Sequence, residues 1–331
     1  MKRITNLGLA TLLAAAFVTG LLSQSSGTQW GAAFVTIHGV TALAIVALSP
    51  WKTAISRQGL ARPQRRGKLR SLTLAGLVLL TIGSGLLQMT GTVTRIGPLH
   101  PMQIHVGAAF LIVPFVVGHY RRHPVRWRRT DWQRRVFLRG GVLTAVAGLA
   151  WIGWERSVAA FGWPGENRRF TGSHERSSYL PAGMPAFQWL DDRIQHLDPE
   201  VWRLAVDDRS LTYEELWDFP QEDVTAHLDC TSGWYSTQIW RGIRLDRLIQ
   251  VGEATSIEVR SITGYARRFP VRDLDRLWLA LEVGAEPLLP GHGYPARLVA
   301  PDRRGFWWVK WVESIRPSSI PWWIQSPFPL T

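Results

Sequence analysis

Five long apolar runs in the first 154 residues constrain the fold of this chain more than any other feature. Each run approaches the length of about 20 residues that an α-helix needs to cross about 30 Å of hydrocarbon. No small-residue cleavage site ends the first run and four more follow it, which argues against a secretory signal peptide. The sequence therefore predicts an all-α membrane bundle in residues 1–154, with helices over residues 6–22, 31–49, 71–89, 102–119 and 137–154.

The charges between these runs indicate how the bundle is oriented. The chain carries a net charge of +13, and its arginines and lysines gather in the alternate segments 50–70 and 120–139. Of the other loops, 23–30 carries no charged residue, and 90–101 carries only Arg95. By the positive-inside rule, we expect a multi-pass protein of the cell membrane, with everything after residue 154 on the extracytoplasmic side. No aromatic residues interleave with the basic ones in a groove-like pattern, so we expect the lipid bilayer and no nucleic acid as a partner.

Histidines inside the predicted spans indicate a redox cofactor, because ionisable residues in a bilayer are costly and usually functional. His38 and His105 both fall in the outer half of their spans, so they can meet as axial ligands of one haem iron. His119 lies fourteen residues after His105, but the corresponding position on the second span is Lys52. We therefore expect a single haem b, and the alternative is that His38 makes a polar contact between helices. The run "IHVGAAFLIVPFVVGHYRRHP" also resembles the haem-bearing helix of membrane b-type cytochromes.

The segment "QRRVFLRGG" (133–141) resembles the twin-arginine export motif. Arg134 and Arg135 precede a variable residue, a Phe-Leu pair and a basic residue, while Gln133 replaces the usual Ser or Thr. This resemblance implies that the following domain crosses the membrane already folded around a complex cofactor. The alternative is that a pair of arginines arose by chance in an arginine-rich loop and serves only to orient the spans.

Residues 155–331 have a mixed, tryptophan- and proline-rich composition and are numerous enough for one well-buried domain. Short β-like runs recur between turn signals, and the clearest helical pieces are 212–220 and 245–252. We predict an α+β domain dominated by sheet. The predicted strands are 202–206, 256–265, 277–283, 296–301 and 306–317.

Cys230 is the only cysteine, and it lies in the stretch "HLDCTSGWYSTQIW" (227–240). A lone cysteine cannot form an internal disulfide. The residues alone leave three alternatives open: a small buried hydrophobic residue, a nucleophile or a metal ligand.

Three blocks of the C-terminal region carry a resemblance. They are "LDCTSGWYSTQIWRGIRLDRLI", "SITGYARRFP" and "GHGYPARLVAPDRRGFWWVKWVESI". Together they resemble the molybdopterin-binding domain of the sulfite oxidase superfamily over nearly all of residues 170–331. That superfamily also holds assimilatory nitrate reductases and the catalytic subunits of periplasmic methionine-sulfoxide reductases. The resemblance implies that Cys230 is the single protein ligand to molybdenum, a role that suits a soft thiolate.

The resemblance also implies roles for further residues. Arg297 matches an arginine that anchors the cofactor, Lys310 matches a lysine near the pterin phosphate, and His292 stands where many relatives have asparagine. Surface pairing is the alternative for Arg297 and Lys310. The other expected cofactor-binding residues are His227, Thr231, Ser261 and Thr263. The expected substrate-pocket residues are Tyr235, Arg267 and Arg268, with Tyr235 and Arg267 as the expected catalytic residues beside Cys230.

These expectations combine into one hypothesis. The chain resembles the minimal branch of the superfamily fused to a cytochrome b-like membrane domain. It is expected to transfer an oxygen atom on the outer face, acting on a small oxidised or oxidisable substrate. Electrons would pass through the haem to or from the quinone pool, and reduction is favoured over oxidation. The alternatives are sulfite dehydrogenation and a membrane-anchored binding protein that has lost the cofactor.

Overall fold

The computed structural model describes residues 2–60, 68–122, 124–125, 128–131, 133–188 and 192–326. These residues divide into two compact units. The helical unit comprises residues 1–24 and 29–174, and the sheet unit comprises residues 25–28 and 175–331. The boundary between residues 154 and 155 that the sequence suggests falls inside the fifth helix, and it stays a prediction.

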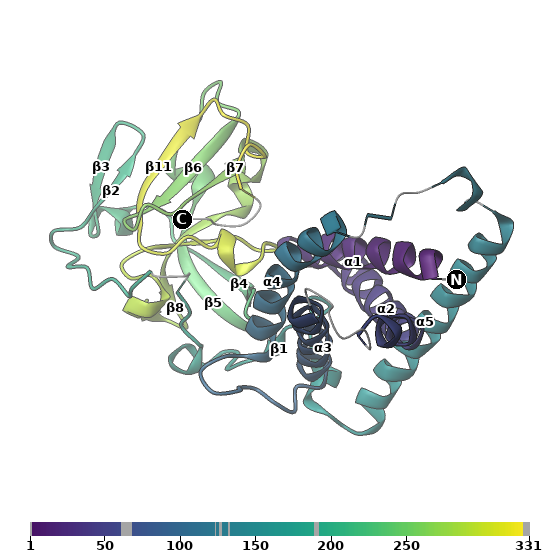
Figure 1. The fold of residues 1–331 in the computed structure, drawn as a ribbon. Helices are drawn as coiled ribbons and strands as arrows, with labels where there is room; N and C mark the ends of the chain where they lie inside the picture. The colour runs from purple at the N-terminus through teal and green to yellow at the C-terminus, as the bar shows by residue number, and fades with distance from the viewer. Residues whose placement is uncertain are drawn as a thin grey trace. The chain divides into compact units, whose positions relative to one another are not determined.

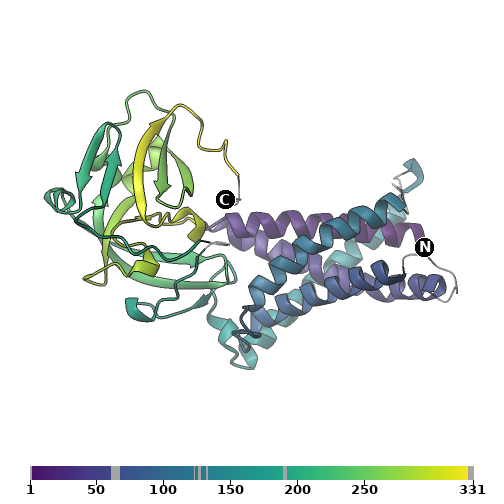
Figure 2. The same ribbon diagram turned by 60° about the vertical axis from the view of Figure 1, so that its left-hand side comes forward.

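The helical unit contains five long α-helices, and each contains one of the predicted spans (Figures 1 and 2). They are α1 (Lys2–Ser25), α2 (Trp30–Leu60), α3 (Lys68–Thr90), α4 (Pro101–Arg122) and α5 (Arg134–Ala160). Large apolar side chains such as Leu79 and Leu149, 71% and 70% exposed, cover their outer faces. A helix that is apolar all round belongs in a membrane or in a large core. These five candidate transmembrane helices confirm the predicted apolar bundle and indicate a multi-pass membrane protein.

Within the helical unit, α3 packs along α4 and α2 packs along α5. Gly39 allows the second contact, because a Cβ atom built on it would lie only 1.8 Å from Cζ3 of Trp151 in α5. Close approach through a small residue is the usual way in which membrane helices gain packing contacts. Parts of the two basic segments 50–70 and 120–139 lie outside the described residues, including Arg62, Arg65, Arg66, His123 and Arg126.

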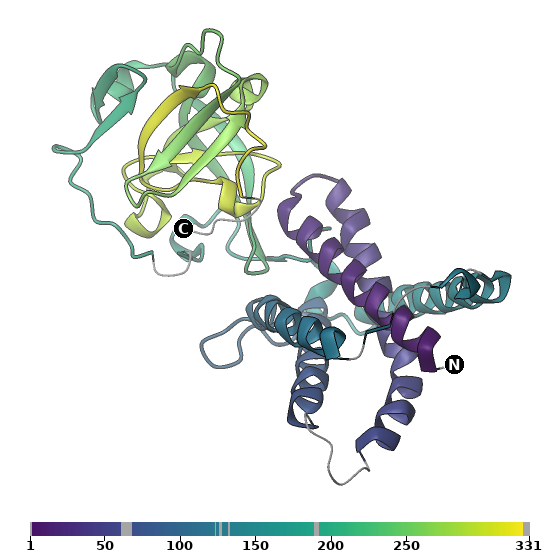
Figure 3. The same cartoon turned by 45° about the horizontal axis from the view of Figure 1, so that its top comes forward.

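The sheet unit is built on two β-sheets (Figures 1 and 3). One sheet has the strand order β1-β5-β8-β10, with β4 beside β5 and β9 beside β8, and the other has the order β3-β2-β11-β6-β7. The strands of the first sheet are β1 (His174–Glu175), β4 (Glu222–Cys230), β5 (Trp234–Arg244), β8 (Trp278–Val283), β9 (Glu286–Pro287) and β10 (Arg297–Val299). The strands of the second sheet are β2 (Arg203–Val206), β3 (Arg209–Thr212), β6 (Ser256–Ser261), β7 (Ala266–Pro270) and β11 (Val312–Ser318).

The core of the sheet unit is a single cluster of buried apolar side chains from both sheets, including Trp240, Leu279, Ile257 and Phe269, all fully buried. The predicted sheet-rich α+β class is confirmed by this architecture. Helix is scarce, since α6 (Leu245–Leu248) is a single turn.

Several predicted elements differ from the structure. The predicted helix 245–252 is only the single turn α6, and the predicted strand 256–265 ends at Ser261, where a turn leads to β7. The predicted helix 212–220 is a 3₁₀ turn at Glu215–Asp218, because the Glu215 carboxylate and Thr212 bond to each other's backbone N–H and close a short loop. The predicted strand 306–317 begins only at Val312, because the segment before it makes a 3₁₀ turn at Gly305–Trp307.

Candidate functional site

Cys230 is the last residue of β4 and lies at the tip of the hairpin that β4 forms with β5, where it pairs with Trp234. The intervening turn contains Thr231, which is half-buried, and Gly233, whose φ of 93° is in the left-handed region that favours glycine. The Cys230 Sγ lies 3.1 Å from the Ser232 Oγ. The thiol is half-buried, so the hairpin tip presents it to a ligand without burying it completely.

A buried ion pair fixes the end of this strand. Arg304 donates from Nη1 to the Asp229 Oδ1 at 2.7 Å and from Nη2 to the Cys230 carbonyl at 3.1 Å. The side chains of Arg304 and Asp229 are only 1% and 3% exposed. The next residue, Gly305, lies so close that a Cβ atom on it would be 3.2 Å from the Cys230 Cα. The loop that follows β10 is thus held against the end of β4, the strand whose last residue is Cys230.

Sequence reasoning missed Asp229 and Arg304. A signal was present for Asp229, because a carboxylate beside the lone cysteine in an apolar strand requires a buried partner. The partner itself lies 75 positions away, and nothing in the local pattern around "PDRRGF" distinguishes Arg304 from Arg303.

Arg297 lies in β10 and is 1% exposed. Its Nη1 donates to the His292 carbonyl at 2.9 Å, and its guanidinium lies 5.0 Å from the Trp240 ring centre and 5.5 Å from that of Trp308. Burial lowers the pKa of Arg297 to about 9, and the nearby Cys230 acts in the opposite direction. Its Nε has no hydrogen-bond partner among the described residues. A buried donor without a partner is costly, and a ligand acceptor at this position would remove that cost.

Lys310 places a second cation in the same region. Its Nζ donates to the Phe187 carbonyl at 2.8 Å and to the Gly291 carbonyl at 2.6 Å. Burial, followed by repulsion from Arg297, lowers the pKa of Lys310 to about 7, while Cys230 and Asp192 raise it. Neutral carbonyls hold the ammonium group in place but leave its charge largely uncompensated.

His292 completes the cluster. It is 3% exposed, and its Nε2 lies 3.0 Å from the Met184 carbonyl oxygen. Burial and the positive charges of Arg297 and Lys310 lower the pKa of His292 to about 4, so the imidazole is neutral at pH 7. Two buried cations, a neutral histidine and a thiol therefore share one electrostatic environment. Such a set suits an anionic ligand rich in hydrogen-bonding groups that also carries a soft metal.

The structure does not bring every predicted residue to the thiol. His227 bonds through Nδ1 to the Thr237 Oγ1 at 2.8 Å, and its ring makes an edge contact with Tyr235. Tyr235 pairs with Asp229 rather than with Cys230. Because side chains alternate between the faces of a strand, Tyr235 and His227 share the face opposite to that of Cys230. Their expected roles stay predictions.

Ser261 is the last residue of β6, and Thr263 lies in the turn between β6 and β7, where its Oγ1 donates to the Ser261 Oγ at 3.2 Å. Arg267 is 2% exposed and lies over the ring of Phe306 at 5.0 Å. Its Nε donates to the Tyr265 hydroxyl at 2.8 Å and its Nη1 to the Ser326 carbonyl at 2.6 Å. These contacts join β7 to the segment after β11, residues 319–326, which is called the C-terminal segment below. The expected role of Arg267 in the substrate pocket stays a prediction.

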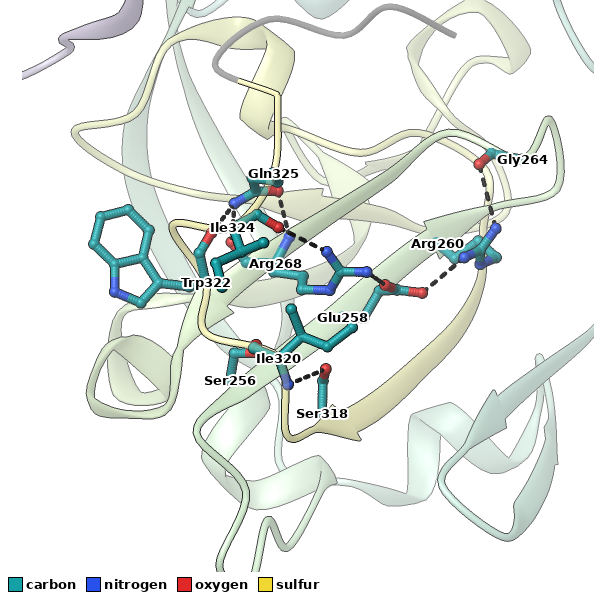
Figure 4. A network of polar contacts seen from close by, with 10 residues as sticks. All are labelled: Ser256, Glu258, Arg260, Gly264, Arg268, Ser318, Ile320, Trp322, Ile324 and Gln325. Carbon is teal, nitrogen blue, oxygen red and sulfur yellow. Dashed lines mark hydrogen bonds and ion pairs between the residues drawn. The ribbon is translucent and has the colours of Figure 1, made fainter.

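Arg268 belongs to a polar network between β6, β7 and the same C-terminal segment (Figure 4). Its guanidinium pairs with the Glu258 carboxylate at 2.7 Å and donates to the Ile324 carbonyl at 3.1 Å. The side-chain amide of Gln325 accepts from the backbone N–H of Arg268 at 3.0 Å and donates to its carbonyl at 2.9 Å. The described contacts of Arg268 thus fasten the C-terminal segment to the second sheet.

In the helical unit, the structure brings His38 of α2 and His105 of α4 together. Their ring centres lie 5.7 Å apart and their planes cross at 81°. The Nδ1 of His38 lies 2.8 Å from the Ala16 carbonyl oxygen, and the Nδ1 of His105 lies 2.7 Å from the Thr81 carbonyl oxygen. In both rings the hydrogen bond to a carbonyl assigns the proton to Nδ1, which leaves the Nε2 lone pair available.

A family model described as oxidoreductase molybdopterin binding domain matches residues 192–322. Mitochondrial sulfite oxidase of Rattus norvegicus is 28% identical over 167 residues, which cover 38% of this chain and 31% of that protein. The chain therefore spans about a third of the length of this relative. The oxidoreductase YuiH of Bacillus subtilis (strain 168) is 26% identical over 124 residues, covering 35% of this chain and 63% of that protein.

One similar solved structure is that of the sulfane dehydrogenase SoxCD from Paracoccus pantotrophus, with 25% identity and a TM-score of 0.36 over 38% of this chain and 40% of that one. The family match spans the thiol, the ion pair that fixes it and the two buried cations. Residues 192–322 are thus an oxidoreductase molybdopterin-binding domain of the sulfite oxidase family, and the described part of the chain also holds five candidate transmembrane helices.

Proposed function

We propose that the chain is a membrane-anchored molybdenum oxidoreductase that transfers an oxygen atom on the extracytoplasmic side of the cell membrane. Electrons are relayed through a b haem in the helical unit to or from the quinone pool. The observation that carries this proposal is the half-buried Cys230 thiol beside the buried cations Arg297 and Lys310, inside the matched domain.

The residues present fit molybdopterin. Cys230 supplies the soft thiolate that holds the metal. Arg297 offers its unpartnered Nε, and Lys310 offers a positive charge that neighbouring carbonyls do not neutralise. Both cations offset the negative charge of the pterin phosphate. When bound, the cofactor supplies two-electron oxygen-atom transfer.

The chain's own residues position that group and manage charge around it. The Asp229–Arg304 pair holds the backbone of Cys230, so the sulfur keeps its place whichever ligand is bound. The pKa of Lys310 near 7 allows its Nζ to take up or release a proton close to neutral pH, and an anionic ligand favours the charged form.

The helical unit supports the haem part of the proposal. Each of His38 and His105 directs a free Nε2 away from the carbonyl that its Nδ1 engages. Metal–imidazole bonds are about 2 Å long, so two imidazoles that held one metal ion between them would have ring centres roughly 6 Å apart. The observed 5.7 Å matches that arrangement. A haem held by both imidazoles would carry electrons rather than bind substrate.

Two features support the extracytoplasmic side. The basic segments alternate with nearly uncharged loops, which favours a cytoplasmic N-terminus. Arg134 and Arg135 begin α5, the helix that precedes the cofactor-binding domain, as a twin-arginine export signal would.

The substrate is proposed to be a small oxide, such as a sulfoxide, which gains two electrons and two protons and loses its oxygen as water. A second candidate is sulfite oxidation, in which water supplies the oxygen and the electrons flow towards quinone. The matched relatives that are named sulfite oxidases favour this second candidate.

Assays of the purified full-length protein in both directions test the proposal. Methionine sulfoxide and related oxides are supplied with a reduced quinone analogue, and sulfite is supplied with the oxidised analogue. Turnover in one direction that disappears in Cys230→Ser supports the enzyme and identifies the direction. Metal-loaded protein that shows no turnover in either direction contradicts it and favours a binding protein.

A further inference from the structure

The first two pairs of helices share a sequence pattern. The segment "TGLL" (19–22) in α1 corresponds to "SGLL" (84–87) in α3. The segment "IHGVTALAIV" (37–46) in α2 corresponds to "IHVGAAFLIV" (104–113) in α4, with the histidine in the same place. The α1–α2 hairpin and the α3–α4 hairpin are therefore similar in sequence at the positions that surround His38 and His105.

One three-dimensional contact repeats as well. In each hairpin the histidine Nδ1 engages a carbonyl of the preceding helix, that of Ala16 or that of Thr81. In each hairpin a glycine follows that carbonyl residue by four positions, so it lies one turn further along the same helix face. A Cβ atom on Gly20 would lie 3.1 Å from the His38 Cε1, and one on Gly85 would lie 2.9 Å from the His105 Nδ1.

This repeated unit has a physical consequence. A carbonyl fixes the tautomer and the tilt of each imidazole, and a glycine one turn away leaves room for the ring to reach that carbonyl. The two rings consequently meet with their planes crossed at 81°. A pair of hairpins that run in the same direction through a membrane is related by an axis along the membrane normal, as parallel repeats of transporters are.

The repeat does not extend to the other end of the two hairpins. His119 is fourteen residues beyond His105, and the equivalent position in the first hairpin is Lys52. The Nζ of Lys52 donates to the Asn6 Oδ1 at 2.9 Å. An ammonium group engaged in this way cannot mirror the role of an imidazole. The two hairpins therefore match in their outer halves and diverge in their inner halves.

We propose that the two hairpins are pseudo-symmetric copies, each of which contributes one carbonyl–glycine–histidine unit to a single haem site. Gly20 and Gly85 are positioning residues in these units, and they hold the imidazole planes crossed on one iron. This inference rests on the haem of the proposed function. It adds the glycines, the backbone carbonyls and the relative orientation of the ligands.

The test compares Gly85→Ala and Gly20→Ala with Gly83→Ala in the full-length protein. Gly83 is the matched control, because it lies two residues from Gly85 in the same helix and a Cβ atom on it meets nothing within 4 Å. Alanine favours a helix over glycine, so loss of helix cannot explain a defect. Changes next to a ligating histidine typically weaken metal binding roughly 10-fold or more. We expect such a loss in Gly85→Ala, a smaller one in Gly20→Ala because its clearance is larger, and unchanged haem content in Gly83→Ala.

Electron paramagnetic resonance of the oxidised wild type tests the orientation of the two imidazole planes directly, independently of how stable the protein is. Crossed imidazole planes give a strongly anisotropic low-spin signal with one dominant low-field feature, whereas parallel planes give three resolved lines. A protein without haem overturns the haem of the proposed function itself. A protein with paired-imidazole optical bands and a three-line spectrum, or with equal haem content in all three variants, overturns only this inference.

Discussion

The buried ion pair behind the thiol gives a prediction whose size follows from its geometry. Arg304 and Asp229 are 1% and 3% exposed and lie 2.7 Å apart, so Arg304→Met leaves a buried carboxylate without its partner. Breaking such a pair typically costs about 3–5 kcal/mol. The matched control is Arg303→Met, because Arg303 pairs with Asp273 at 2.6 Å while both side chains stay partly exposed, at 28% and 20%. Pairs of this kind contribute about 0–1 kcal/mol.

Thermal unfolding of the full-length protein measures the difference, followed by tryptophan fluorescence. For a unit of this size, 1 kcal/mol shifts the midpoint by about 2–4 °C. We expect the transition of the sheet unit to fall by about 10 °C in Arg304→Met and by a few degrees at most in Arg303→Met. The double variant Asp229→Leu/Arg304→Met should recover part of the loss, because neither charge is then left alone. Equal shifts in Arg304→Met and Arg303→Met, or a double variant that is no more stable than Arg304→Met, would refute the reasoning.

Three further predictions concern pH, export and haem. Because burial lowers the pKa of Lys310 from 10.5 to about 7, the unfolded cofactor-free chain binds more protons than the folded one between these values. The free energy of unfolding should therefore rise with pH across this window, and the rise should be smaller in Lys310→Met. Urea titrations at several pH values measure this free energy. An equal dependence on pH in the wild type and in Lys310→Met would contradict the prediction. Replacing Arg134 and Arg135 with lysines should strand the domain in the cytoplasm, whereas unchanged protease exposure in spheroplasts would make the pair an orientation signal only. His38→Ala should remove the paired-imidazole absorption bands and His119→Ala should keep them; the reverse result would exclude the assigned ligand pair.

The membrane helices could be predicted from the sequence because their signal is local. A run of apolar residues near the length of a bilayer specifies a helix whatever its neighbours are. The structure extends the helices beyond the predicted spans, as in α2, which continues through Pro50 to Leu60. The meeting of His38 and His105 was also predictable, because the depth of each histidine in its span follows from counting residues.

The sheet unit was harder to predict, because its strands depend on distant partners. The long β4–β5 hairpin around the thiol was not anticipated as strands, since buried polar residues such as Ser236 and Gln238 break the apolar alternation. The resemblance pointed to Cys230, Arg297 and Lys310, and the structure places these three in one electrostatic environment. Arg304 could not be found from its local sequence, because only the folded loop after β10 brings it to Asp229.

Metal analysis of the purified full-length protein, made in a host supplied with molybdate, tests the central claim most directly. The account predicts that the wild type contains molybdenum in a stoichiometric amount. It also predicts that Cys230→Ser loses most of that metal and all turnover while its domain stays folded, because a hydroxyl is a poor replacement for a soft thiolate. Wild-type protein free of molybdenum, or a Cys230→Ser variant with full metal content and turnover, would contradict the account.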